Sequence, residues 1–323
     1  MPDAFATFMT AHSPALLWGL AGVLALLTLG AAAAVLLPIL KPGKDYTNLR
    51  DRVVSWWIMA ALLVGALLAG WQATVILWVV ISFLALREFL SLAPTRREDR
   101  LIMLVAYLTI PISYGFIAAD TYGFFLVFIP IYVFLAIPWL MACVGQTKGF
   151  LPTVALFHWA IVTCVYNLGY VALLMRADPA ETPAGPAGLV FLLLVATEAN
   201  DVAQYVWGKL LGRHKIIHRV SPNKTWEGFI GGWITTALLI WFLGPLLLPA
   251  AIPPIGLAII AITLPFAGFA GDVTMSAIKR DIGVKDTSHF IPGHGGVLDR
   301  ADSLTFTAPL FFHLVAYYGM EKF

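Results

Sequence analysis

The stretch that decides the fold runs from Pro254 to Arg280 and reads "PIGLAIIAITLPFAGFAGDVTMSAIKR". No charged residue precedes Asp272, and this apolar run approaches the roughly 20 residues that a helix needs to cross a bilayer. An aspartate, a serine and two basic residues then follow. The stretch therefore predicts a transmembrane helix that carries polar groups at one end.

The rest of the chain repeats the apolar part of this pattern. Its 323 residues are 60% hydrophobic and only 12% charged, whereas a soluble domain would carry far more surface charge. We expect an all-α, polytopic integral membrane protein with about ten transmembrane helices, the second and third joined by a tight hairpin. One membrane domain, 1–323, is predicted, with N-terminal helices in 1–185 and catalytic helices and loops in 186–323. The expected spans are 15–38, 53–70, 72–90, 101–118, 121–143, 152–175, 187–208, 227–249, 254–275 and 303–319.

The basic residues predict the orientation of these spans. All of the 20 lysines and arginines except Arg176 and Lys322 fall in the loops that follow the odd-numbered spans. Basic loops mark the cytoplasmic face. The polar loops 209–226 and 276–302 are therefore both expected on the cytoplasmic side.

The polar end of the opening stretch has helical spacing. Asp272, Ser276, Lys279 and Arg280 stand at i, i+4, i+7 and i+8, which places them on one stripe of a helix. A carboxylate at membrane depth would thus be followed outward by a hydroxyl and two cations. More polar residues come after this helix, namely Lys285, Asp286, His294, Asp299, Arg300 and Asp302.

The segment "PGHGG" (292–296) lies among these residues. Gly293, Gly295 and Gly296 can adopt backbone conformations closed to other residues and can bring N–H groups close to an anion such as phosphate. His294 could donate a hydrogen bond to the same anion. Taken alone, His294 would be read as a loop histidine without a task.

A second polar group begins inside the seventh span. Glu198 and Asp201 share one helical face, and an ionised carboxylate at mid-membrane costs about 2.5–3.5 kcal/mol on insertion scales. A functional role is favoured for Asp201. For Glu198, a functional role and a structural one, in helix packing or at the membrane interface, are equally favoured.

The segment "SPNKTWEG" (221–228) is expected to form a turn, Ser221 to Asn223, before the eighth helix. Ser221 or Thr225 could cap that helix, and Lys224 would lie beside its positive end, an arrangement that suits a phosphate. Taken alone, an ordinary capped helix flanked by cytoplasmic charges is the favoured interpretation.

Together these residues predict a type of chemistry. Acidic oxygen ligands without cysteine favour Mg²⁺ or a similar hard cation, and the cations suit a polyphosphate. The motifs of acyl transfer and of P-loop nucleotide hydrolysis are absent from the sequence. The pattern indicates metal-assisted phosphoryl or nucleotidyl transfer at the cytoplasmic edge of the membrane. A polytopic transporter, which would also keep intramembrane acids, is a weaker alternative.

The run S-x₂-K-R-x₄-K-D-x₅-P-G-H-G-G-x₂-D-R-x-D, Ser276 to Asp302, resembles the signature of the phosphatidate cytidylyltransferases, or CDP-diacylglycerol synthases. The preceding Gly271-Asp272 and the "SPNKTWEG" segment are also similar to that family. The resemblance is clear over 198–305. Before it, only "REF" (Arg87 to Phe89) is similar.

The resemblance implies conversion of CTP and phosphatidic acid to CDP-diacylglycerol and pyrophosphate. It also implies Mg²⁺, a second cation such as K⁺, and a homodimer among membrane lipids, with nucleic acid not expected as a partner. We expect a multi-pass protein of the bacterial inner membrane with its active site facing the cytoplasm. The predicted metal ligands are Asp272, Asp299 and Asp302, and the predicted catalytic residues are Asp272, Lys279, Arg280 and Asp299. The predicted substrate-binding residues are Asp201, Ser221, Lys224, Thr225, Glu227, Ser276, Lys285, Asp286, His294, Gly295, Gly296 and Arg300.

Two positions depart from the family pattern. Met275 stands where many members have an acidic residue, and Gln204 stands where many have alanine before the tyrosine. A divergent branch with another phospholipid acceptor or altered metal use therefore stays open. A related CTP-dependent enzyme acting on another lipid phosphate or on a lipid alcohol is a separate alternative.

Overall fold

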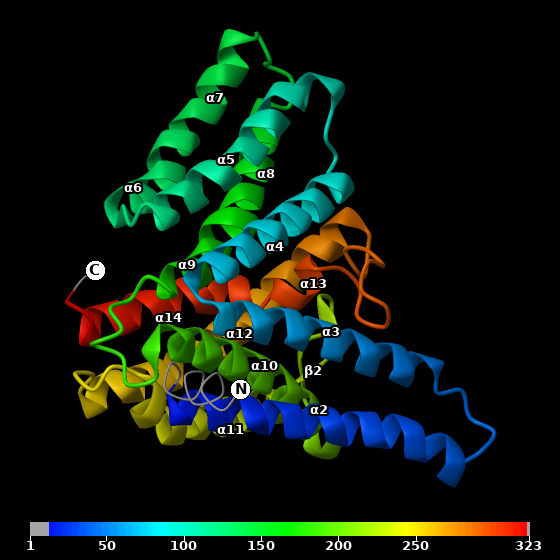
Figure 1. Cartoon of the computed structure of the whole chain (residues 1–323). Helices are drawn as coiled ribbons and strands as arrows, with labels where there is room; N and C mark the ends of the chain where they lie inside the picture. Colours follow the sequence, from blue (N-terminus) through cyan, green and yellow to red (C-terminus); the bar gives the residue numbers. More distant parts are fainter. Residues whose placement is uncertain (1–12, 322–323) are drawn as a thin grey trace.

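The computed structural model describes residues 13–321, most of which are helical (Figure 1). The helices are α2 (Pro14–Leu40), α3 (Thr47–Ala69), α4 (Trp71–Leu92), η1 (Arg97–Asp99), α5 (Arg100–Ala118), α6 (Tyr122–Val127), η2 (Phe128–Val133), α7 (Phe134–Cys143), α8 (Phe150–Ile161), η3 (Val162–Asn167), α9 (Leu168–Leu174), α10 (Gly185–Leu211), α11 (Trp226–Leu247), α12 (Pro254–Ile282), α13 (Leu298–Ala301) and α14 (Leu304–Gly319).

Within residues 13–321, nine helical segments are long and apolar enough to cross a membrane. Two of them, Tyr122–Cys143 and Phe150–Leu174, contain a π-helical turn. The predicted class, an all-α polytopic membrane protein, is confirmed, and the nine segments match the first nine predicted spans to within a few residues at most ends.

The tenth predicted span corresponds to α14, which is not among these nine segments. It has 16 residues and is therefore about 24 Å long at 1.5 Å per residue, shorter than the roughly 30 Å hydrocarbon core. It packs against α9, α10 and α12, and Phe311, Phe312 and Val315 are fully buried. Its apolar sequence thus reflects burial inside the bundle.

The predicted hairpin between the second and third spans is also confirmed. Gly70 alone separates α3 from α4, and its φ of 101° lies in the region that favours glycine. The hairpin keeps α3 beside α4, so that both helices reach the same polar end of the molecule.

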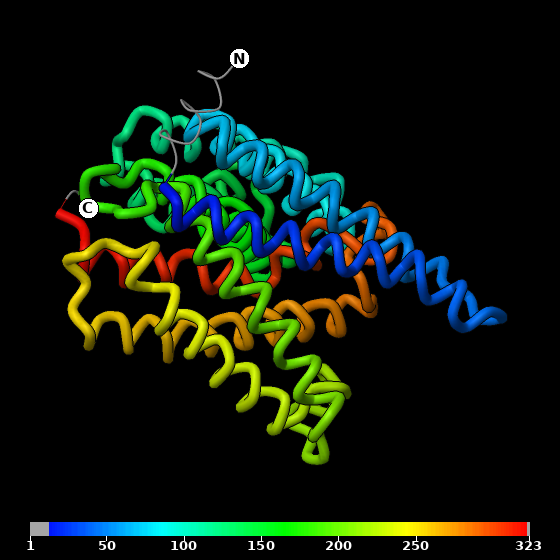
Figure 2. Tube along the Cα trace, turned by 60° about the horizontal axis from the view of Figure 1, so that its bottom comes forward, coloured from blue at the N-terminus to red at the C-terminus, as the bar shows by residue number. Residues whose placement is uncertain are grey.

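The second half of the chain forms a bundle. Helix α10 packs along α11, and α12 packs against α10, α11 and α14. In Figure 2, α10 and α11 run side by side away from the rest of the chain, with α2 crossing α10. Helix α13 reaches across to α4, which ties the loop after α12 to the first half of the chain.

A small antiparallel β-hairpin joins α10 to α11. Strand β1 (Lys215–Ile217) pairs with β2 (Ser221–Thr225), so the predicted turn at Ser221 to Asn223 is wrong, and these residues lie in β2. Lys215 pairs with Thr225 only because the chain folds back on itself. The strand propensities of the residues in this polar segment do not predict that pairing. The predicted cap is confirmed, because Thr225 Oγ1 accepts a hydrogen bond from Gly228 N at 3.1 Å.

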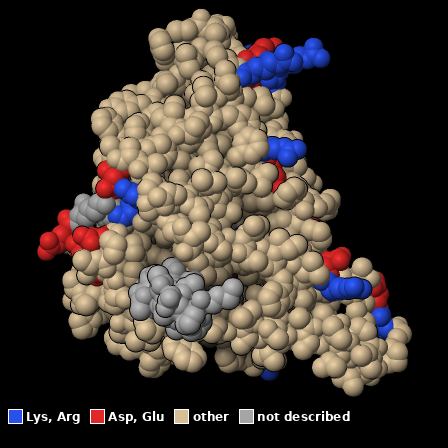
Figure 3. All heavy atoms as spheres, in the orientation of Figure 1, with Lys and Arg blue, Asp and Glu red and all other residues tan. Residues whose placement is uncertain are grey.

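The molecular surface carries few charges. Figure 3 shows one face almost free of them, with Lys and Arg gathered mostly along one edge, where the α2–α3 and α4–α5 loops lie in Figure 1. A smaller mixed group of charges lies on the opposite edge. Lys322, one of the two exceptions in the predicted charge pattern, is outside the described residues.

Candidate active site

The centre of the candidate site is an ion pair between Asp272 on α12 and Lys224 on β2. Lys224 Nζ contacts Asp272 Oδ2 at 2.5 Å and also donates to Gln204 Oε1 at 3.2 Å. One helical turn beyond Asp272, Ser276 Oγ donates to Asp272 Oδ1 at 3.2 Å. The ammonium group lies 4.9 Å from the centre of the Phe269 ring. Three predicted residues, Asp272, Ser276 and Lys224, are thus brought together.

Two further carboxyl groups lie beside this ion pair. Asp201 Oδ2 accepts a hydrogen bond from Ser303 Oγ at 2.8 Å, whereas Asp201 Oδ1 is buried without a partner among the described residues. A Cβ at Gly271 would lie 2.7 Å from the carbonyl oxygen of Asp302, so only glycine lets α12 approach so closely. Burial, together with the carboxylates of Asp272 and Asp201, raises the pKa of Asp302 to about 8. The site therefore gathers carboxyl groups in a buried place, where burial and the neighbouring carboxylates disfavour the ionised form of Asp302.

The raised pKa of Asp302 predicts a pH-dependent effect on stability. The folded pKa of about 8 exceeds the ordinary value of 3.8, so ionisation of Asp302 destabilises the fold progressively between about pH 4 and pH 8. In chelator, purified Asp302→Asn protein should therefore have a higher Tm than wild type at about pH 8.5, with a smaller difference at about pH 5.5. Asp281→Asn, on the exposed end of α12, is the control. A Tm below that of wild type at both pH values would contradict this account.

Asp299 forms the second ion pair of the site. Its Oδ1 accepts from Lys279 Nζ at 2.8 Å, and its Oδ2 accepts from Thr287 N at 2.7 Å and Gly296 N at 2.9 Å. Burial favours the protonated carboxyl, but the hydrogen bonds from Lys279 and the backbone outweigh it, so the pKa of Asp299 is lowered. Lys279 and Asp299, both predicted as site residues, therefore form a buried, ionised contact with each other.

The glycine segment wraps around carboxylates of the protein itself. Gly296 N donates to Asp299, and the next two N–H groups donate to Glu88 on α4 at 3.0 Å. Gly295 has a φ of 87°, and a Cβ there would lie 2.7 Å from Asp299 Oδ2. The glycines thus allow a close approach to internal anions. A role of Gly295 and Gly296 in phosphate binding stays a prediction.

Two predicted residues stabilise backbone near the β-hairpin. The carboxylate of Glu227 accepts from the backbone N–H groups of Arg213 and His214 at 3.0 and 3.2 Å. The Arg280 guanidinium donates to the carbonyl oxygens of Val220 and Val284 at 3.4 and 3.0 Å. Arg280 is exposed, and a role in binding substrate phosphates stays a prediction.

The remaining predicted residues lie in the loop between α12 and α13, except Arg300, which lies on α13. The His294 ring meets the Trp56 ring edge to face, with centroids 5.8 Å apart, which joins the loop to α3. Lys285, Asp286 and Arg300 are exposed. They are available to a charged substrate, and their binding role stays a prediction.

Sequence reasoning missed Glu88 as a site residue. Its carboxylate is buried and accepts from the side chains of Thr287 and Ser288 in addition to two backbone N–H groups. The available signal was a carboxylate at the end of an apolar span, within the "REF" segment. Gln204 was noticed only as a departure, yet it contacts Lys224 directly.

The candidate metal ligands of the site are carboxylate oxygens, which a hard cation such as Mg²⁺ prefers. Carboxylate oxygens of Asp201, Asp272 and Asp302 gather here, and one of them has no partner among the described residues. Within residues 13–321, no three acidic, histidine or cysteine side chains are positioned as a ready set of metal ligands. Both oxygens of Asp299 already accept from protein donors.

A model of the cytidylyltransferase family matches residues 50–318. The uncharacterized protein YnbB of Escherichia coli strain K12 is 41% identical over 266 residues, which cover 82% of this chain and 87% of YnbB. The phosphatidate cytidylyltransferases of Mycobacterium leprae and Bacillus subtilis are each 41% identical, over 124 and 130 residues. These two matches cover 38% and 40% of this chain, and 38% and 48% of the relatives, so the similarity spans about half of each relative or less.

The family match and the geometry agree on the same region of the molecule. The matched residues include most of α3, all of α4, the β-hairpin and α12, and α13, which carries Asp299. Since the match extends over most of its length, the chain belongs to the cytidylyltransferase family, and it is a membrane enzyme of the nucleotidyltransferase class.

Proposed function

We propose that the protein transfers a cytidylyl group from CTP to phosphatidic acid, forming CDP-diacylglycerol and pyrophosphate. The observation that carries the proposal is the polar centre at the end of α12, where Lys224 and Asp272 pair beside further buried carboxyl groups. Such a centre can receive a nucleotide from water and a lipid phosphate from the membrane. The names of the two phosphatidate cytidylyltransferase relatives support this choice of substrates.

The reaction requires positioning and charge neutralisation. The phosphate of phosphatidic acid is already an oxyanion, so it can attack the α-phosphorus of CTP without a strong general base. The bond from the α-phosphorus to the bridging oxygen breaks, and pyrophosphate leaves with that electron pair. Lys224, Lys279 and Arg280 supply positive charge around the phosphates. The pairing of two of these cations with Asp272 and Asp299 fixes where their charges lie.

Mg²⁺ is part of the proposal. Asp272, Asp302 and Asp201 would hold it, and a bound metal ion would neutralise the charge on the reacting phosphates. The unpartnered oxygen of Asp201 and the mutual repulsion of these carboxylates support a cation at this place. Asp299 would join as a ligand only by giving up one of its protein donors. A second cation such as K⁺ belongs to the same proposal.

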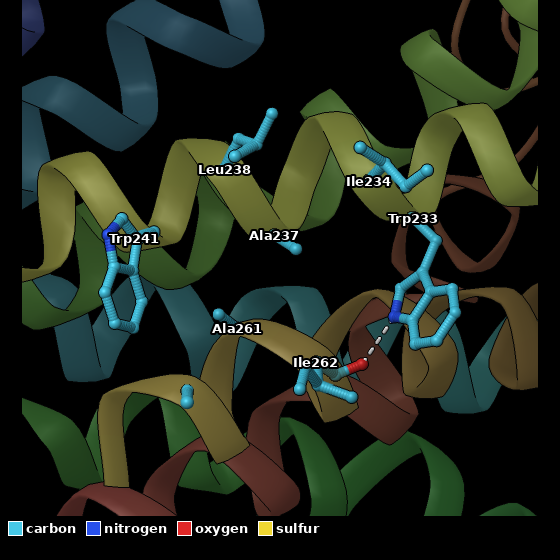
Figure 4. A pocket seen from close by; sticks show the side chains of 8 residues that line it. Trp233, Ile234, Ala237, Leu238, Trp241, Ala261 and Ile262 are labelled. Carbon is cyan, nitrogen blue, oxygen red and sulfur yellow. Dashed lines mark hydrogen bonds between the residues drawn. The ribbon is translucent and has the colours of Figure 1, made fainter. Parts of the chain in front are cut away.

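An apolar groove between α11 and α12 supports a lipid substrate. Trp233, Ala237 and Trp241 face Ala261 and Ile262 across it, and Trp233 Nε1 donates to the carbonyl oxygen of Ile262 at 2.6 Å (Figure 4). The two alanines leave space between the helices.

Aromatic rings connect this groove to the polar centre. Lys224 lies over Phe269, the Phe269 ring lies 4.5 Å from Phe229, and Phe229 stacks on Trp233 at 6.2 Å. Trp233 is about 10 Å along α11 from its first residue, Trp226, at 1.5 Å per residue. A lipid phosphate at Lys224 would thus have an apolar surface for one acyl chain directly beside it.

Filling the groove should therefore discriminate between long and short acyl chains. We expect Ala237→Phe, at a partly buried position of the groove, to raise the KM for dioleoyl phosphatidic acid about 10-fold, the effect of removing about two methylene contacts. The KM for CTP and the rate with soluble dihexanoyl phosphatidic acid should stay unchanged. Ala33→Phe, on the exposed surface of α2, is the matched control. An equal loss with both lipids would contradict acyl-chain binding in the groove.

The direct test of the proposed function is product analysis. Purified protein with CTP, Mg²⁺ and a panel of lipid phosphates should form CDP-diacylglycerol from phosphatidic acid, as measured by mass spectrometry. A CTP-dependent kinase acting on a lipid alcohol would instead form CDP. Failure to consume CTP with any lipid phosphate, and with diacylglycerol as a lipid alcohol, would refute the enzyme assignment and leave the transporter alternative.

We also propose a homodimer in the bacterial inner membrane with the site facing the cytoplasm. Support for the orientation comes from the basic residues, since Lys41, Lys148 and Lys285 all fall in loops that follow odd-numbered spans. In a Lys285→Cys variant, the new cysteine should react with a membrane-impermeant thiol reagent only after the cytoplasmic face of the membrane is exposed.

A further inference from the structure

Glu88 is a buried carboxylate that binds the loop between α12 and α13 from outside the C-terminal half of the chain. Its Oε1 accepts from Ser288 Oγ at 2.8 Å and from Val297 N at 3.0 Å. Its Oε2 accepts from Thr287 Oγ1 and Leu298 N, both at 3.0 Å. Three donors from this loop and one from the first residue of α13 therefore converge on a single side chain of α4.

The environment of Glu88 is unusual for a buried charge. The residue is 8% exposed, and within residues 13–321 no cation forms an ion pair with it. Neutral donors, two of them backbone N–H groups, compensate for the lost hydration instead. All four donors lie in residues 287–298. Glu88 therefore keeps its hydrogen bonds only while this segment stays in place.

Glu88 and Asp299 are linked through Thr287. The Thr287 hydroxyl lies 3.0 Å from Glu88 Oε2 and 2.9 Å from Asp299 Oδ2. A hydroxyl has one proton, so it donates to one carboxylate at a time. Gly296 is packed between the same groups, since a Cβ there would lie within 2.5 Å of both Thr287 Oγ1 and Glu88 Oε2. The two carboxylates thus share one closely packed set of partners.

Helix α3 holds the same loop from a second direction. Ser55 Oγ donates to the carbonyl oxygen of Pro292 at 2.8 Å, and Trp56 contacts the His294 ring. The outer part of the loop is therefore held by α3 and its base by Glu88. Only the base carries Asp299, which pairs with Lys279.

We propose that Glu88 is a positioning residue for the transfer reaction: its carboxylate anchors the base of the loop on α4 and thereby fixes Asp299 against Lys279. Glu88 does not touch the reacting phosphates and acts through Asp299. The inference rests on the proposed function for its kinetic part, and on the loop contacts alone for its structural part. It gives the N-terminal half of the chain a role in the reaction beyond spanning the membrane.

The test is Glu88→Gln in the purified full-length protein. The amide keeps the shape of the side chain, but its NH₂ group faces donors that it cannot satisfy. With CTP and phosphatidic acid, kcat should fall about 10- to 100-fold, as is typical when a residue that orients a ligand group is lost, while the KM for CTP stays within about threefold. Hydrogen exchange of the backbone amides in 287–298 should become faster. Glu98→Gln, an exposed carboxylate at the same end of α4, should change neither quantity.

Thr287→Val serves as the second variant if Glu88→Gln does not fold. It removes the hydroxyl shared by Glu88 and Asp299, and should also lower kcat with little change in the KM for CTP. The proposal would be overturned by wild-type kcat in the folded variants, by unchanged hydrogen exchange in 287–298, or by a loss of rate that only parallels a loss of folded protein. If wild-type protein forms no CDP-diacylglycerol, the proposed function fails, and hydrogen exchange alone still decides whether Glu88 anchors the loop.

Discussion

Asp299→Asn is expected to lower the rate of CDP-diacylglycerol formation about 100- to 1,000-fold, the loss typical when a positioned electrostatic partner is removed from an active site. The change leaves Lys279 Nζ without its charged partner and replaces one acceptor oxygen by an NH₂ group. The ammonium would then be free to move from the place where the phosphates need it. Steady-state rates with the purified variant measure this effect.

Stability must be measured beside the rate of this variant. Removing one partner of a buried ion pair costs about 3–5 kcal/mol, because the remaining charge stays buried. We therefore expect a lower Tm as well, and rates must be expressed per folded molecule, as judged by gel filtration. Asp281→Asn, exposed on the last turn of α12, is the matched control. A folded Asp299→Asn enzyme with wild-type rate would remove Asp299 from the reaction.

Asp272→Asn is expected to have an effect of similar size on rate with a different effect on stability. Asp272 pairs with Lys224 and also raises the pKa of Asp302, so it influences both the cation and the remaining carboxylates. We expect the rate to fall about 100- to 1,000-fold. The Mg²⁺ concentration for half-maximal activity should rise, because a negative oxygen ligand is lost.

The fold should tolerate Asp272→Asn better than Asp299→Asn. The loss of the ion pair with Lys224 is partly offset by relief of repulsion among the neighbouring carboxylates, and Lys224 keeps Gln204 as an acceptor. The Tm in chelator should therefore drop less for Asp272→Asn than for Asp299→Asn. If Asp272→Asn lowered the Tm as much as Asp299→Asn does and left the Mg²⁺ requirement unchanged, Asp272 would be structural. That result would contradict its role at the metal.

The part of the site that sequence could predict lies on one helix. Asp272, Ser276 and Lys279 follow helical spacing, and α12 continues through all three, so their common stripe was predictable from the period of the helix alone. The cap at Thr225 was also predictable from local sequence, because capping depends on a few adjacent residues.

The contacts between distant segments could not be predicted. Lys279 reaches Asp299 across an irregular loop, and Glu88 reaches Thr287 across 199 residues. No local pattern encodes the path of such a loop, which is set by donors and acceptors that meet only in the folded protein. The nature of α14 was ambiguous for another reason, since a buried helix and a lipid-facing helix have similar apolar composition.

The measurement that tests the central claim most directly follows the phosphorus atoms of CTP. Purified protein with Mg²⁺ and phosphatidic acid is given CTP labelled at either the α- or the γ-phosphorus. Cytidylyl transfer predicts that the α-label enters the lipid, that the γ-label appears only in pyrophosphate, and that the two products form in equal amounts. Transfer of the γ-label to the lipid, or release of CDP, would contradict the account.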